Sequence, residues 1–118
     1  MKNKQFNDLV LTPIQQALCK DRIDEVTTVI RCSVCNTNLF AKLSKGDSVC
    51  IGVPSRGISC LPEVVRTVVE ELLKIGAVPF LVPAMGSHGG GTAEGQREIL
   101  EKLAGILTDY DIAIKSDI

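Results

Sequence analysis

Apolar and polar residues alternate in blocks along the second half of the chain, and the blocks predict a series of short elements. Residues 48–53 and 78–82 are short apolar runs of the kind that form buried strands. Between them, residues 61–75 carry apolar side chains on one face of a helix, and Gly76 stands where a glycine commonly ends one. That face consists of Val64, Val65, Val68, Leu72 and Leu73. The pattern predicts a strand, a helix and a second strand, in that order.

The alternation continues toward the end of the chain and is weaker before residue 45. Residues 93–103 have helical spacing behind Thr92, a good N-cap residue, and residues 111–114 are typical of a third strand. Residues 23–44 fit a helix, although their β-branched run also suits a strand, and we favour the helix. Thr12-Pro13 could open a short helix, and Lys45-Gly46-Asp47 is typical of a turn.

The order strand–helix–strand–helix–strand predicts an α/β fold with a mainly parallel sheet, because parallel neighbours need crossover connections. We expect a three-layer, Rossmann-like domain over residues 1–118, with a lead-in over residues 1–45 and a βαβαβ core over residues 46–118. In such sheets, ligands bind at the carboxyl ends of the strands. The loops after the first two strands, residues 54–60 (the arginine loop) and 83–92 (the glycine loop), should therefore emerge side by side at that edge.

Composition disfavours several functional classes. The chain has 118 residues, of which 45% are hydrophobic, and this fits one small globular domain. Its 13 basic and 14 acidic side chains form no basic stripe and aromatic residues make up only 3%, so we expect no nucleic-acid partner. No apolar run is long enough to cross a bilayer and the N-terminus lacks a signal-peptide core, so we expect a cytoplasmic protein without a membrane partner.

The five cysteines do not form a recognisable metal or redox motif. Cys32 and Cys35 make a CxxC, but neither a second CxxC nor a nearby histidine completes a zinc site. Without a secretory signal, reduced thiols are expected. We interpret them as buried or partly buried structural thiols, since free cysteine usually packs as a small hydrophobic residue.

The glycine loop carries the strongest candidate chemistry. It holds His88, the single histidine of the chain, among Gly86, Gly89, Gly90 and Gly91. Glycine allows sharp turns and close approach to a ligand, the N-terminus of the following helix attracts anions, and an imidazole can carry a proton near neutral pH.

The arginine loop adds a carboxylate-binding group to the same edge. The guanidinium of Arg56 matches a carboxylate or phosphate with a fork of donors. Ser55, Ser87 and Thr92 supply hydroxyl groups, and Gly57 gives the arginine loop its own flexible backbone position. The set suits a small anionic substrate with a proton to move, such as a hydroxy acid.

Simpler interpretations stand beside this one. His88 could be an exposed loop histidine, Arg56 could pair with Glu63, and the glycines could serve only a tight turn. The loop is neither a GxGxxG dinucleotide motif nor a P-loop. Glu70 and Glu71 suggest a solvated helix face. The alternative function is a non-enzymatic module that binds a small anion or a nucleotide.

Together the two loops resemble the N-terminal domain of the lactate racemase family. The resemblance rests on SRGI at residues 55–58 and PAMGSHGGGTAEGQ at residues 83–96, and it is best over residues 46–103. The nearest pattern is that of the larger, uncharacterised racemase-like members. It implies a nickel-dependent 2-hydroxyacid racemase or epimerase that uses a nickel-pincer nucleotide. In the resemblance, His88 is the acid–base group on the substrate hydroxyl, Arg56 holds the substrate carboxylate, and hydride passes to and from the cofactor.

The chain departs from this family at two positions of the arginine loop region. Typical racemases have an acidic residue where this chain has Val53, and a proline where it has Gly57. The family's cofactor-anchoring lysine and histidines lie beyond residue 118. We therefore expect the chain to be the N-terminal part of a larger enzyme, partnered by a C-terminal domain, and we expect these 118 residues alone to be inactive and to bind neither nickel nor the cofactor.

Overall fold

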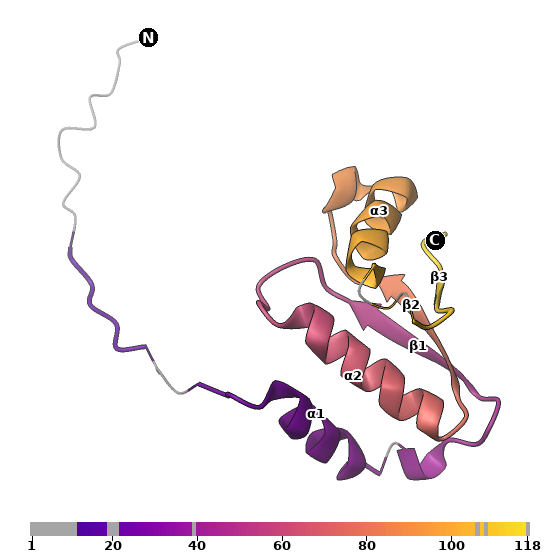
Figure 1. The fold of residues 1–118 in the computed structure, drawn as a ribbon. Coiled ribbons are helices and arrows are strands. Elements are labelled where there is room, and N and C mark those ends of the chain that lie inside the picture. Colours follow the sequence, from indigo (N-terminus) through magenta and orange to yellow (C-terminus); the bar gives the residue numbers. More distant parts are fainter. Residues whose placement is uncertain (1–11, 19–21, 39, 106, 108, 118) are drawn as a thin grey trace.

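The computed structural model describes residues 12–18, 22–38, 40–105, 107 and 109–117. Its elements, drawn in Figure 1, are α1 (Val26–Cys35), the 3₁₀ turn η1 (Phe40–Lys42), β1 (Ser48–Val53), α2 (Leu61–Lys74), β2 (Val78–Pro83), the 3₁₀ turn η2 (Gly89–Gly91), α3 (Ala93–Ala104) and β3 (Ala113–Ile114). Every predicted element of the second half of the chain is present; the third strand is two residues shorter than predicted, and the other bounds agree to within one residue. The helix favoured within residues 23–44 is also confirmed, whereas residues 12–18 contain no helix.

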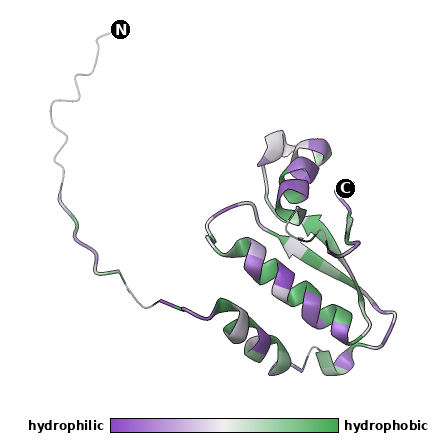
Figure 2. Cartoon of the chain, viewed as in Figure 1, coloured by the Kyte–Doolittle hydropathy of each residue, from purple (hydrophilic) through white to green (hydrophobic). Residues whose placement is uncertain are grey.

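The three strands form one parallel sheet in the order β1-β2-β3, which confirms the α/β prediction. The register pairs Ile51 with Leu81, and Leu81 with Ile114, so these residues lie on the same face of the sheet. Leu81 is fully buried there. Figure 2 shows β1 and β2 as largely hydrophobic, in contrast to α2, on which hydrophobic and hydrophilic residues alternate.

One hydrophobic cluster joins the sheet to both of the following helices. It contains Val53 and Leu81 from the strands, Val65 and Val69 from α2, and Leu100 from α3. Both helices therefore cover the same face of the sheet. Two crossovers of the same hand that step in one direction along a sheet place their helices on one side, which explains this arrangement.

We call the opposite face of the sheet the open face. Its exposure differs from the three-layer prediction, which places helices on both faces of the sheet. Cys50 and Val78, which alternate with the core positions, are exposed, and no described helix lies over them. Phe80 is partly buried on this face, where the ammonium group of Lys115 lies 4.0 Å from its ring centroid. The described residues thus form a sheet with helices on one face, and a helix layer on the other face is not among them.

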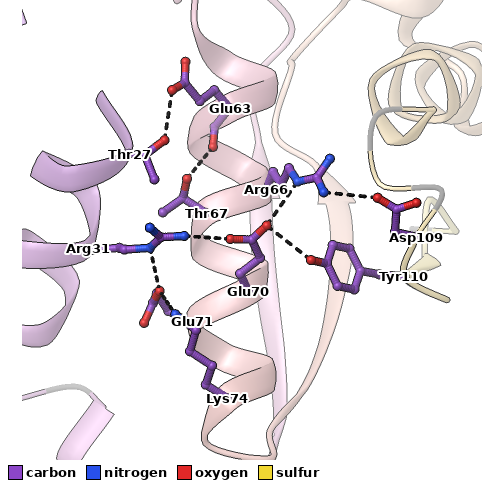
Figure 3. A network of polar contacts seen from close by, with 10 residues as sticks. All are labelled: Thr27, Arg31, Glu63, Arg66, Thr67, Glu70, Glu71, Lys74, Asp109 and Tyr110. Atoms are coloured by element: carbon purple, nitrogen blue, oxygen red, sulfur yellow. Dashed lines mark hydrogen bonds and ion pairs between the residues drawn. The ribbon is translucent and has the colours of Figure 1, made fainter. Parts of the chain in front are cut away.

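Helix α1 packs against the outer side of α2 through polar contacts, which Figure 3 shows. The guanidinium of Arg31 donates to Glu70 and to Glu71, in both cases over 3.0 Å. The Nζ of Lys74 lies 2.6 Å from the same Glu71 carboxylate, and Thr27 donates to Glu63 over 2.9 Å. The prediction of a solvated face for Glu70 and Glu71 is wrong, because α1 covers it.

Glu70 also links α2 to the segment that precedes β3 (Figure 3). Its Oε1 accepts from the Nε of Arg66 over 3.1 Å and from the Tyr110 hydroxyl over 3.2 Å. Arg66 also donates to Asp109 over 3.1 Å. The hydrogen bond from Arg66 is the main reason why the pKa of Glu70 is lowered. For Glu71, the pKa is lowered chiefly by Lys74 and further by Arg31.

Helix α2 ends as the sequence predicts. Gly76 has φ +78°, and its N–H donates to the carbonyl of Leu73, while Ala77 donates to the carbonyl of Leu72. This pair of bonds is a Schellman motif, whose left-handed position favours glycine. It turns the chain directly into β2.

The cysteines are less buried than the sequence analysis expected. Cys32, Cys35 and Cys50 are exposed and Cys60 is half-buried, and none of these four is in a disulfide. The prediction of burial is wrong for the first three, and that of reduced thiols stays a prediction. Cys32 and Cys35 lie on the outer side of α1 and Cys50 lies on the open face of the sheet, while Cys19 lies outside the described residues.

No helix within the described ranges is both long and apolar enough to span a membrane.

Candidate functional site

The arginine loop and the glycine loop leave the sheet side by side. Both follow parallel strands, and their backbones stay paired one step beyond the register, because the N–H of Ala84 donates to the carbonyl of Val53 over 2.9 Å. This position is the carboxyl edge of the sheet, where α/β proteins bind their ligands. The predicted neighbourhood of the two loops is confirmed.

A side-chain contact joins the two loops directly. The Oγ of Ser55 is hydrogen-bonded to the Nδ1 of His88, and both residues are half-buried. The imidazole of the glycine loop therefore lies against the residue that precedes Arg56. Because His88 is only half-buried, solvent partly reaches its side chain.

Arg56 extends from the same loop into solvent. It is exposed, and within the described ranges it has neither an ion pair nor a hydrogen bond. Glu63, the partner in the simpler interpretation, instead accepts from Thr27. The backbone places Arg56 at the edge that carries His88, and no hydrogen bond joins these two described side chains. Because the guanidinium of Arg56 has no such partner among the described residues, all its N–H donors are available to an anion.

The glycine loop uses backbone conformations that other residues rarely adopt. Gly86, Gly89, Gly90 and Gly91 have φ values of +57°, +63°, +70° and +66°. Within it, the N–H of His88 donates to the carbonyl of Met85 over 3.2 Å, and the N–H of Gly91 donates to the carbonyl of His88 over 3.1 Å. The glycines therefore set the path of a compact loop around His88.

The loop also rests closely on the first turn of α3. A Cβ on Gly95 would lie 2.0 Å from the carbonyl oxygen of Gly89, and a Cβ on Gly89 would lie 2.4 Å from the carbonyl carbon of Gly95. Neither distance is possible for a real side chain, so both positions require glycine for close approach, and Gly89, with φ +63°, also requires it for its backbone conformation. Gly95 was part of the sequence motif, but only the structure shows this reason for it.

Gln96 is a site residue that the sequence analysis did not single out. Its side chain is 6% exposed, and its Nε2 donates to the carbonyl of Gly86 over 2.7 Å and to that of His88 over 3.3 Å. The amide thus fixes the backbone on both sides of Ser87. A signal was present in the sequence: Gln96 stands four residues before Leu100, on the face of the helix that packs into the core.

The remaining predicted hydroxyl groups differ in their availability. Thr92 accepts from the N–H of Gly95 and donates to the carbonyl of Gly89, each over 3.1 Å, so its hydroxyl acts as the N-cap of α3. Ser87 is exposed. The predicted N-cap is confirmed, and the positive end of the α3 dipole lies at the glycine loop.

The structure gives a physical meaning to the two departures from the racemase pattern. Val53 is fully buried in the hydrophobic cluster, so this position contributes packing and no charge to the site. Gly57 has φ +91°, which a proline ring, fixed near −65°, cannot adopt. The arginine loop therefore follows a path that the proline-containing pattern does not allow.

The donor set for nickel is not found in the described residues. Within these ranges, no group of three or more histidine, cysteine, aspartate or glutamate side chains could hold a metal ion. The residues present therefore do not fit the metal that the resemblance implies, and its anchors would have to come from elsewhere.

Comparison of the chain with protein-family models, with curated proteins and with solved structures finds no match. The resemblance to the lactate racemase family accordingly rests on the residues of the two loops.

Proposed function

We propose that the two loops form the substrate-facing part of a 2-hydroxyacid racemase or epimerase, with His88 as the acid–base group and Arg56 as the carboxylate binder. The observation that supports this most is the hydrogen bond between Ser55 and His88, since it brings the histidine of one motif to the arginine-bearing loop of the other. The family resemblance supplies the reaction class.

The chemistry of a 2-hydroxy acid matches these groups. Its carboxylate and its hydroxyl sit on adjacent carbons, so one substrate presents an anion and a proton donor within a few ångströms. An exposed guanidinium can bind the carboxylate through two parallel hydrogen bonds, and the N-terminus of α3 favours the same negative charge. An imidazole beside them can accept the hydroxyl proton and return it.

The proposal limits the role of this chain to substrate binding and proton transfer. Because the described residues hold no donor set for nickel, no step through the metal or its nucleotide is assigned to them. In the proposal, the cofactor and a further domain complete the site.

The second candidate is a module that binds a small anion or a nucleotide without chemistry. It is favoured by the same exposed Arg56 beside a glycine loop at a helix N-terminus, a set of groups that could bind phosphate without a proton-transfer residue.

Titrations followed by NMR of the single histidine distinguish the two. We expect D- and L-lactate to shift the imidazole signals of His88, and propionate, which lacks the hydroxyl, to shift them much less. Arg56→Lys should weaken lactate binding about tenfold, because an ammonium cannot form the bidentate fork. Arg97→Lys, at an exposed arginine of α3 that pairs with Glu101, is the matched control and should bind as the parent chain does. Equal effects of lactate, propionate and phosphate would favour the binding module.

Turnover tests the acid–base role. In the full-length, cofactor-loaded protein, His88→Asn should lower racemisation about 10²–10⁴-fold, the usual contribution of general acid–base catalysis, while the circular dichroism spectrum stays unchanged. Chiral chromatography of lactate measures the rate. Unchanged racemisation by this variant would contradict the proposed role of His88.

A further inference from the structure

Strand β1 lies at one edge of the sheet, and the backbone groups on its outer side have no described partner. On its inner side, the carbonyls of Asp47, just before the strand, and of Val53, its last residue, accept from N–H groups next to them on the segment that contains β2. The backbone groups of a strand point alternately to its two sides, so those of Ser48, Cys50 and Gly52 point away from β2. Within the described ranges, no strand and no hydrogen bond pairs these three outward residues on that side.

An apolar groove runs along the same edge, on the side of the sheet that the helices cover. Its volume is about 360 Å³, and its apolar lining comes from β1, from α2 and from the region of η1. These side chains are Phe40, Leu43, Val49, Ile51, Val68 and Leu72. All of them except the buried Leu72 are only half-buried. A strand added beside β1 would therefore pair with free backbone groups and also cover apolar surface.

The edge formed by β1 lacks the features that usually prevent pairing with another chain. Natural edge strands are kept apart by charged residues, by proline, by bulges or by being very short. The six residues of β1, SVCIGV, include neither a charged residue nor a proline, and their register with β2 is continuous. The strand at the other edge, β3, has only two residues. Of the two edges, β1 is therefore the one that can accept a further strand.

We propose that β1 is a self-association surface, on which β1 of a second copy of this chain pairs antiparallel about a two-fold axis at Cys50. A two-fold axis makes the two strands antiparallel and uses the same residues on both copies. In this register Cys50 lies opposite Cys50 of the second copy, and Ser48 lies opposite Gly52. Every outward residue of β1 then pairs with an outward residue of β1. Any shift along the edge would place one of them opposite a residue outside the strand.

The side chains of β1 match each other in the same register. On the helix side, Val49 lies opposite Ile51 of the second copy, and two β-branched side chains form a favourable cross-strand pair beside the groove. On the open face, Ser48 and Gly52 are small, and the exposed Cys50 meets its own copy without a charge. The match between the strand and itself, in backbone groups and in side chains, is the reason to expect a second copy at this edge.

The pairing leaves both candidate functional sites open. Because the two copies of β1 run antiparallel, the carboxyl edges of the two sheets point in opposite directions, and each copy keeps its arginine loop and glycine loop away from the shared edge. The proposal therefore stands or falls independently of the proposed function.

Sedimentation equilibrium of the 118-residue chain, with a reductant to prevent disulfides, tests the register by a charge exchange at its axis. Because one strand pair is a small interface, we expect a weak dimer whose population rises with concentration. Cys50→Lys and Cys50→Glu each place like charges directly opposite and should weaken association about tenfold. An equimolar mixture of the two should recover it, because opposite charges then meet. Val78→Lys, at an exposed position of the same face on β2, is the matched control and should associate as the parent chain does.

Amide hydrogen exchange at low and high protein concentration locates the interface. The N–H groups of Cys50 and Gly52 should become protected as the concentration rises, whereas those of Val49 and Ile51, which point toward β2, should not change. Amide spectra report whether each variant keeps the fold. A parent chain that stays monomeric at millimolar concentration, a folded Cys50→Lys variant that dimerises like the parent, or a mixture no better than either variant would overturn the proposal. Protection of Cys50 and Gly52 already in the monomer would overturn it as well, because another segment would then cover the edge.

Discussion

Replacing Gly95 by alanine tests whether the glycine loop is held by close packing on α3. In an ordinary helix interior this change would stabilise the fold by about 1 kcal/mol, because alanine has the higher helix propensity. Here the new Cβ would lie 2.0 Å from the carbonyl oxygen of Gly89 and 3.0 Å from the Oγ1 of Thr92. The first distance is more than an ångström too short, so the glycine loop has to move.

The cost of that movement can be worked from the contacts it breaks. Moving the loop away from α3 gives up the hydroxyl cap of Thr92, worth about 1 kcal/mol, and the two bonds of Gln96 to the loop, worth about 1 kcal/mol each. Against the propensity gain of about 1 kcal/mol, the net result is a destabilisation of about 2 kcal/mol. Because the loop carries His88, the bond to Ser55 should be lost as well.

Urea unfolding followed by circular dichroism measures the free energy change, and NMR of the single histidine reports the loop. Gly52→Ala is the control. The Cβ at this strand position would lie 3.5 Å from that of Ala84, an ordinary contact, and the backbone there does not have a positive φ. That variant should be stabilised by about 0.4–1 kcal/mol through the unfolded state. A stabilised Gly95→Ala variant with parent histidine signals would refute the close packing of loop and helix.

Three further predictions concern the helices. Ion pairs lower the pKa of Glu70 and Glu71, so the stability that these carboxylates contribute is present above the ordinary glutamate pKa and is lost as the pH falls through the lowered values. Melting curves at a series of pH values should show Tm falling in that window, and Tm should fall less in the double variant Glu70→Gln, Glu71→Gln. Arg31→Met should speed amide hydrogen exchange in α1 while lowering the free energy of unfolding by no more than about 1 kcal/mol. The control Arg97→Met breaks only the exposed ion pair within α3 and should change the free energy of unfolding by less than about 0.5 kcal/mol. Thr92→Ala should cost about 1 kcal/mol in urea unfolding through loss of the cap of α3, and Thr92→Ser should restore most of it; equal stability of all three chains would contradict the capping role.

Local patterns predicted the elements of the second half of the chain, because their signals are carried by neighbouring residues. The apolar run at residues 48–53, the helical spacing of residues 61–75 and the glycine at position 76 each act within a few residues, and each element begins and ends close to the predicted position. The parallel sheet followed from the order of these elements. The placement of the arginine loop and the glycine loop at one edge followed from the parallel sheet, because neighbouring parallel strands end at the same edge.

Tertiary structure decided the features that depend on residues far apart in the chain. Glu70 and Glu71 have the composition of a solvated face and form ion pairs with Arg66 and Lys74 within α2, but only the tertiary packing adds the ion pairs with Arg31 and the hydrogen bond from Tyr110. The exposure of Cys50 depends on both helices lying over the other face of the sheet. The sequence placed Ser55 and His88 on neighbouring loops, but a hydrogen bond between side chains 33 positions apart depends on the fold of both loops at once. The sequence by itself determined which elements form, because propensity and periodicity are local; the fold determined which groups meet, because burial and hydrogen bonding depend on three-dimensional proximity.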